Sequence, residues 1–269
     1  MEKTCKLGLL SINCSIVKLH LKLKTLTLCP SCSVQYLLRK NKIKDRLKDI
    51  YYSHKLRRIS NEYIFIHVPK CGGTSLRKNL NINLNAYIYD WHEIKLKHLN
   101  PNQKAIVCIR NPIKRFESAF YSKIHMKKNL NEKEKGFYEK FRDINVFIDA
   151  LMNDNKNVVN YLKYLNAIPI ITRYSSLQYW FGSLSHLEKN KHKIKYAIKL
   201  ENLNNDLSQI FQSEQLKPQP LINKLNAKPK DKFVPIDQKY ISFLNHYLDE
   251  EFVQSNTIFF SQYKMYIRN

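Results

Sequence analysis

Apolar residues in this chain of 269 residues gather in short continuous runs, which alternate with longer segments of helical spacing. The runs at 63–68, 86–91, 105–109 and 194–200 contain many β-branched and aromatic side chains, which is typical of buried parallel strands. Helices are predicted between and after these runs, at residues 76–80, 112–126, 134–153, 158–165, 202–212 and 236–253. The alternation predicts an α/β fold with a mostly parallel central sheet and flanking helices.

The first 60 residues differ from the rest, because 14 Lys and Arg stand there against three Asp and Glu. Their clearest periodic pattern predicts a basic helix at residues 36–58. We expect a basic N-terminal extension at residues 1–60 and one larger domain at residues 61–269.

Two uncharged stretches near the start, residues 7–17 and 25–38, bear on membrane insertion. Both are shorter than the roughly 20 residues that a membrane-spanning helix needs. No convincing small-residue cleavage site follows the first stretch. We expect a soluble, cytoplasmic protein without a transmembrane span.

The formal net charge of +24 changes the range of functions to consider. Of the 46 basic residues 36 are Lys, a pattern that compositional bias and solvation would also produce. The alternative is a field that attracts an anionic nucleotide or an acidic glycan. A nucleic-acid-binding protein is a further alternative, but no zinc-finger, RNP or helix-turn-helix signature supports it, so no nucleic-acid partner is expected.

Six cysteines are present, and Cys29 and Cys32 form one CxxC pair. No second CxxC follows, so neither a zinc site nor a disulfide framework is predicted.

The segment after the first strand has the composition of an anion-binding turn. Gly72 and Gly73 let successive backbone N–H groups turn inward, and the helix that follows adds unpaired donors at its N-terminus. Thr74 and Ser75 contribute hydroxyls, and Lys70 contributes a positive charge. The alternative is a tight turn in which Thr or Ser caps the helix.

This turn differs from the loop of nucleoside triphosphatases, GxxxxGK[ST], in which Lys follows the glycines. Here Lys70 precedes them, and no strand-ending Asp is suited to holding Mg²⁺. The sequence therefore predicts a site for one phosphate without a required metal, which disfavours the alternative of a P-loop nucleotide kinase.

A second segment, residues 106–119, carries cationic and hydroxyl groups at the end of the third strand. Arg110 stands at the carboxyl end of this strand, where ligands bind in open α/β sheets. Arg115 and Ser118 are three residues apart in the next helix and share a face. These groups are predicted to hold a second phosphate, unless the two arginines form ordinary salt bridges.

Together the two segments resemble the PAPS-dependent carbohydrate sulfotransferases, whose donor is 3′-phosphoadenosine 5′-phosphosulfate. Residues 67–76 are similar to the 5′-phosphosulfate loop of that family, with Cys71 where Thr is usual. Arg110 and Ser118 have the spacing of its 3′-phosphate motif. Residues 200–203 resemble a further landmark, and the likeness covers roughly residues 60–255.

The resemblance implies a three-layer, P-loop-like fold and transfer of a sulfuryl group from PAPS to a hydroxyl, with PAP as product. It implies a donor site formed by Lys70, Cys71, Gly72, Gly73, Thr74, Ser75, Arg110 and Ser118. By the same resemblance the acceptor is a saccharide or other glycan.

Two residues are expected to perform the chemistry. Lys70 would stabilise the departing oxygen, and His92, which follows the second strand, would accept the proton of the acceptor hydroxyl. Glu93 is the alternative base, whereas His67 is expected to pack inside its strand and Glu201 to cap or pair.

Overall fold

The computed structural model describes residues 30–73, 76–77, 80, 84–88, 92–126, 132–153, 177–216 and 234–266. Its contacts divide the chain into two units, Met1–Ile50 and Tyr51–Asn269. Helix α2 (Pro30–Arg57) begins in the first unit and ends in the second. Among the described helices, none combines the length and the hydropathy needed to cross a membrane.

The larger unit contains a four-stranded parallel sheet in the order β2-β1-β3-β4. The strands are β1 (Tyr63–Ile66), β2 (Tyr87–Ile88), β3 (Lys104–Ile109) and β4 (Ile194–Lys199). Residues of β1 and β3 are almost completely buried, as the apolar runs predict. The predicted α/β class with flanking helices is confirmed.

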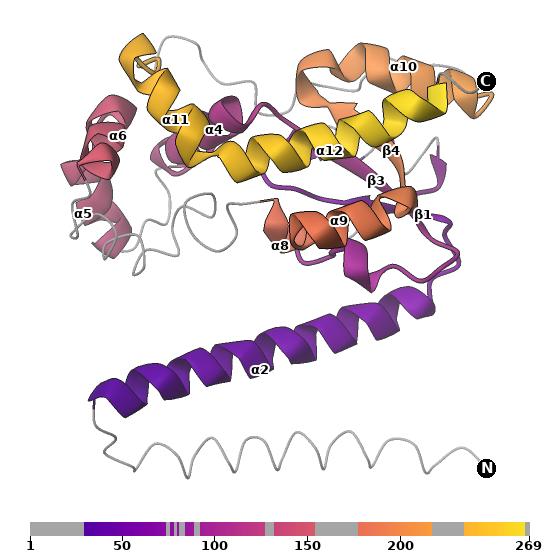
Figure 1. Ribbon diagram of the computed structural model, residues 1–269, viewed down its shortest axis with the longest axis horizontal. Coiled ribbons are helices and arrows are strands. Elements are labelled where there is room, and N and C mark those ends of the chain that lie inside the picture. Colours follow the sequence, from indigo (N-terminus) through magenta and orange to yellow (C-terminus); the bar gives the residue numbers. More distant parts are fainter. Residues whose placement is uncertain are drawn as a thin grey trace. The chain divides into compact units, whose positions relative to one another are not determined.

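Helices and short 3₁₀ turns connect and cover these strands (Figure 1). They are η2 (Leu96–His98), α4 (Pro112–Met126), α5 (Glu132–Lys140), α6 (Ile144–Met152), α8 (Gln178–Phe181), α9 (Leu184–Asn190), η3 (Lys191–Lys193), η4 (Leu200–Asn202), α10 (Leu203–Ser213), η6 (Gln238–Tyr240), α11 (Ile241–Tyr247) and α12 (Asp249–Tyr266). Helices α10 and α12 lie against β4, and α12 also contacts α9.

Two hydrophobic clusters stabilise the larger unit. One surrounds the sheet and includes Phe65, Ile106 and Trp180. The other joins α4, α5, α6 and α11 through aromatic side chains such as Phe120 and Phe147. Figure 1 shows α5, α6 and α11 grouped together, away from the strands.

Several predicted boundaries are wrong, for local reasons. The first strand ends at Ile66 rather than residue 68, because the Val68 N–H turns back to the Ile66 carbonyl. The pattern at 134–153 is two helices, since the Asp143 side chain accepts the Asn145 N–H and caps α6. The pattern at 236–253 breaks at Leu248, and α12 continues to Tyr266.

The turn after β1 depends on backbone conformations that few residues adopt. Lys70 and Gly72 have positive φ angles of 65° and 74°. A Cβ on Gly73 would overlap the imidazole of His67. That ring has little room to move, because it packs on Phe65, with ring centroids 5.6 Å apart, and on His92, with centroids 4.1 Å apart.

Gly73→Ala should therefore lower the free energy of unfolding by about 1–3 kcal/mol, the usual cost of overpacking a filled site. In a His67→Ala background the same substitution should cost much less, because the ring that it would strike is absent. Urea unfolding of the four proteins in this cycle measures the coupling. Equal costs of Gly73→Ala in both backgrounds would contradict this packing.

The end of α2 contributes to the core of the larger unit. Leu56 is 1% exposed, and the buried Gln103 amide donates to the carbonyls of Leu56 and Ile59 at 3.0 and 3.3 Å. The domain boundary at residue 60 stays a prediction. A boundary there would separate Leu56 and Ile59 from Gln103, so these contacts favour a domain that begins earlier.

We predict that a chain shortened to residues 51–269 keeps its unfolding midpoint in urea to within experimental error. A chain shortened to residues 61–269 should lose about 2–5 kcal/mol, because it loses the Leu56 side chain and both acceptors of Gln103. Equal stability of the two shortened chains would show that the end of α2 is dispensable.

Candidate active site

The two segments singled out in the sequence meet at one point of the sheet. Strand β1 lies between β2 and β3, so the chain first moves to one side of β1 and then to the other. This reversal is the place where ligands bind in open α/β sheets. Because β1 and β3 are parallel neighbours, with Ile66 paired to Val107, the turn at Lys70 and the Arg110 side chain extend from the same edge.

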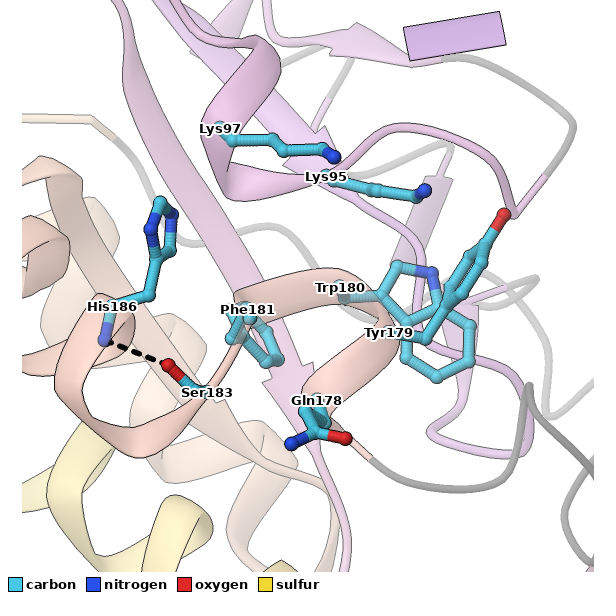
Figure 2. Close-up of a pocket in the computed structure, with 9 residues that line it drawn as sticks. Lys95, Lys97, Gln178, Tyr179, Trp180, Phe181, Ser183 and His186 are labelled. Carbon is cyan, nitrogen blue, oxygen red and sulfur yellow. Dashed lines mark hydrogen bonds between the residues drawn. The ribbon is translucent and has the colours of Figure 1, made fainter. Parts of the chain in front are cut away.

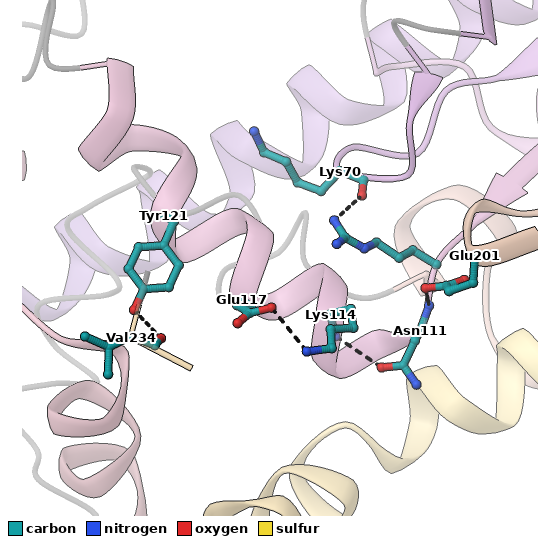
Figure 3. A network of polar contacts seen from close by, with 8 residues as sticks. Lys70, Asn111, Lys114, Glu117, Tyr121, Glu201 and Val234 are labelled. Atoms are coloured by element: carbon teal, nitrogen blue, oxygen red, sulfur yellow. Dashed lines mark hydrogen bonds and ion pairs between the residues drawn. The ribbon is translucent and has the colours of Figure 1, made fainter. Parts of the chain in front are cut away.

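A hydrogen bond joins these two segments. Arg110 Nη1 donates to the Lys70 carbonyl at 3.5 Å, a long bond that uses one of the five N–H donors of the guanidinium. Figure 3 shows the Lys70 side chain extending away from this carbonyl. The guanidinium of Arg110 therefore lies against the backbone of the turn, and the Lys70 ammonium extends elsewhere.

Arg115 holds the same turn from inside the protein. Its side chain is 0% exposed, Nε donates to the Pro69 carbonyl at 3.2 Å, and the guanidinium lies 5.8 Å from the Trp180 ring centroid. A buried charge is tolerated only where such partners replace water. Arg115, which the sequence indicated as a ligand of the second phosphate or as a partner in an ordinary salt bridge, thus fixes the backbone that precedes Lys70.

The remaining residues of the predicted donor site differ in how they are placed. Cys71 is fully buried, so its thiol is not exposed at the turn. Ser118 is 7% exposed on α4, and no hydrogen bond among the described residues joins it to Arg110. Thr74 and Ser75 lie outside the described residues.

The start of α4 is fixed by a chain of polar contacts, drawn in Figure 3. The Asn111 side chain accepts the Lys114 N–H at 3.1 Å, and the Asn111 N–H donates to Glu201 Oε1 at 2.9 Å. Glu201 therefore accepts a backbone hydrogen bond just after β3, which agrees with the prediction that it caps a backbone group.

His92 is held in one tautomer by its surroundings. Its Nδ1 lies 2.8 Å from the His67 carbonyl oxygen, which can only accept, so Nδ1 carries the hydrogen. In the neutral ring the Nε2 atom then has a lone pair and can accept a proton. This is the tautomer that a general base requires.

The pKa values of both histidines also favour neutral rings. Burial lowers the pKa of His92 below its ordinary 6.5, and the charge of Lys70 acts in the same direction, although the His67 carbonyl and Glu93 oppose them. Burial lowers the pKa of His67 to about 3, with smaller effects of His92 and Arg77. His92 is therefore ready to accept a proton at neutral pH.

Helix α8 fixes the turn that carries His92, a role that the sequence did not indicate. The Trp180 indole donates to the His92 carbonyl at 3.0 Å, and the Tyr179 hydroxyl donates to Glu93 Oε2 at 2.7 Å. Glu93, the alternative base, is thus engaged with Tyr179. No motif marks the two aromatic residues, because they lie more than 80 residues from their partners.

Among the described residues, no group of three or more His, Cys, Asp or Glu side chains gathers where it could hold a metal ion. The prediction of a reaction without a metal stays untested.

Comparison with known proteins points to one family. The family model described as the sulfotransferase family matches residues 56–253, which include every candidate site residue. No curated protein and no solved structure matches the chain. Since the match covers well over half of its length, this chain belongs to the sulfotransferase family, and the protein is a transferase of sulfuryl groups.

Proposed function

We propose that the protein transfers the sulfuryl group of PAPS to a hydroxyl of a saccharide and releases PAP. When bound, PAPS supplies the sulfuryl group, whose sulfur forms a bond to the acceptor oxygen while its bond to the bridging phosphate oxygen breaks. The protein must then hold two phosphate groups, stabilise the departing oxygen and accept the acceptor's proton.

One observation carries this proposal: two cationic segments lie at the point where the strand order reverses. The turn at residues 70–73 has the positive φ angles that direct successive N–H groups to one side, and Gly73 has no room for a side chain. Arg110 adds a guanidinium beside this turn. These features suit a nucleotide with a phosphate at each of two positions.

The proposed donor site assigns the 5′-phosphosulfate to Lys70, to Gly72 and Gly73, and to the hydroxyls of Thr74 and Ser75. Cys71 belongs to the proposed site by its place in the loop, although its thiol is buried. Arg110 and Ser118 are assigned to the 3′-phosphate, which distinguishes PAPS from ATP. Lys70 would neutralise the charge that develops on the departing oxygen.

His92 is the proposed base. Its Nδ1–H donates to a backbone carbonyl, and its lowered pKa keeps Nε2 unprotonated near neutral pH. It receives the hydroxyl proton as the acceptor oxygen attacks sulfur. The contact of Glu93 with Tyr179 favours His92 over Glu93 in this role.

Membership in the sulfotransferase family disfavours the two alternatives, a P-loop nucleotide kinase and a nucleic-acid-binding protein. The cytoplasmic location, the saccharide acceptor and the boundary at residue 60 stay predictions.

Arg110 should be needed for recognition of the 3′-phosphate. Arg110→Ala should weaken PAP binding by about 1.5–3 kcal/mol, the range of a charge-assisted hydrogen bond, and should hardly change AMP binding. Titration calorimetry measures both ligands, with the exposed Arg142→Ala as the matched control. Equal losses for PAP and AMP would refute the assignment of Arg110.

The action of His92 as the base should appear in the pH dependence of the activity. His92 acts only when neutral, so activity should rise with pH through the pKa of its imidazole. In kcat/KM, which reports the free enzyme, this rising limb of the pH profile should lie below pH 6.5, because burial lowers the pKa. In kcat the limb should move to higher pH, because a bound anionic donor favours the protonated ring. Transfer of ³⁵S from labelled PAPS measures both profiles.

His92→Ala should reduce kcat by roughly 10²–10⁴ and leave PAP affinity close to normal. The exposed His246→Ala is the control for the loss of an imidazole, and Glu93→Gln tests the alternative base. Full activity of His92→Ala with an unchanged pH profile would place the base elsewhere.

A further inference from the structure

The imidazole of His67 lies against both the turn at Gly73 and the ring of His92. We propose that His67 is a positioning residue, whose ring sets the distance between the bound donor and the base. The inference rests on the proposed function for its place in the reaction, whereas the contact between the two histidine rings can be tested without turnover.

The contact of His67 with the turn is close. A Cβ on Gly73 would overlap Nε2 and Cδ2 of the imidazole, so the backbone at this glycine lies directly against the edge of the ring. Gly73 belongs to the turn to which the 5′-phosphosulfate is assigned. The ring therefore limits how far the backbone of the proposed donor site can approach the base.

The same ring packs on the base itself. The ring centroids of His67 and His92 are 4.1 Å apart, with an angle of 55° between the ring planes. His67 also stacks on Phe65, which is 1% exposed and belongs to β1, a strand with a neighbour on each side. The ring on which His92 rests is thus held by a core residue of an interior strand.

Other groups hold the backbone and the tautomer of His92, and they leave the packing of its ring to His67. The His67 carbonyl accepts the Nδ1–H of His92 at 2.8 Å, and the Trp180 indole donates to the His92 carbonyl at 3.0 Å. Trp180 lies beside Tyr179 on α8, at one wall of the pocket drawn in Figure 2, with ring centroids 5.1 Å apart. Helix α8 therefore fixes the turn that carries His92, and the imidazole of His67 packs against the reacting ring.

An imidazole at this position does not serve stability. Its Nδ1 is buried and has no hydrogen-bond partner in the part of the chain that the structure describes. A buried polar atom without a partner lowers the stability of the folded state. Burial lowers the pKa of His67 to about 3, so the ring stays neutral and does not compete with His92 for the proton.

Charged groups near the two rings would be the same with and without the His67 side chain. Lys70 lowers the pKa of His92 and Glu93 raises it, and Arg77 lowers the pKa of His67. Loss of the His67 ring would let water reach the base and weaken the effect of burial, which is the largest influence on the pKa of His92. The pKa of His92 should then rise toward its ordinary value.

His67→Ala should lower kcat by about tenfold to a hundredfold on the upper plateau of the pH profile, where His92 is neutral in both proteins, because a displaced base reacts poorly. PAP affinity should change by less than about threefold, since Arg110 and Arg115 hold the turn without the ring. Transfer of ³⁵S from labelled PAPS measures kcat, and calorimetry measures PAP binding. A loss of PAP affinity as large as the loss of kcat would overturn the role at the base.

Two further variants separate position from stability. His67→Gln places an amide near the position of Nε2, fills the space beside Gly73, and should recover most of the lost kcat. Ile148→Val removes a buried methyl group from the second hydrophobic cluster and should keep the native kcat and pH profile. If His67→Ala does not fold, His67→Asn, which is too short to fill that space, should show the same loss of kcat. Equal losses in His67→Gln and in the shortened variant, or in Ile148→Val, would overturn the proposal.

The pH dependence gives a readout that a loss of stability alone would not change. In His67→Ala the ring proton resonances of His92, identified by their loss in His92→Ala, should titrate at higher pH than in the native protein. The rising limb of kcat/KM should move in the same direction. An unchanged titration of His92 would overturn the ring contact. If the native protein does not bind PAP, the proposed function is wrong, and the titration of His92 still decides the contact.

Discussion

The parallel pairing of β1 with β3 is the constraint on which the rest of the site depends. It brings the turn at Lys70 and the side chain of Arg110 to one edge of the sheet, although about 40 residues separate them along the chain. Strand β2 lies on the far side of β1, so no strand stands between the two segments. On the proposed assignment, an anion at this edge would face backbone donors from one strand end and a guanidinium from the next.

Buried polar groups then fix the conformation that the pairing permits. Arg115 donates to the carbonyl of Pro69 from inside the core, and Trp180 lies between this guanidinium and the His92 turn. Removing one partner of such a buried contact costs more stability than the contact contributes, because the other polar group is left buried without a hydrogen-bond partner. The turn after β1 and the turn after β2 are therefore coupled through one indole ring.

The sequence predicted the parts of the site that depend on local chemistry. An apolar run, two adjacent glycines and a strand-ending Arg110 each have a direct physical meaning, and the family match covers all of them. The boundaries at residues 66 and 248 could not be predicted, because single hydrogen bonds and backbone angles decide them. Their errors leave the site unchanged.

The sequence could not predict the contacts that position the base, since these depend on packing between distant segments. Tyr179 and Trp180 reach Glu93 and His92 only because α8 packs beside η2. The burial of Arg115 likewise follows from the position of Trp180, and nothing in its own neighbourhood distinguishes it from a surface arginine. The ligands of the proposed donor site stay predictions, Thr74 and Ser75 among them.

The charges around His92 link its strength as a base to occupancy of the proposed donor site. Burial and Lys70 both lower the pKa of its imidazole. A donor bound at the Lys70 turn would bring negative charge close to the ring and offset the charge of the Lys70 ammonium. Both effects would raise the pKa of the imidazole. A base with a higher pKa accepts a proton more readily, provided that the ring is neutral when the acceptor binds. On the proposed assignment, His92 is thus a stronger base when the sulfuryl donor is in place than in the free enzyme.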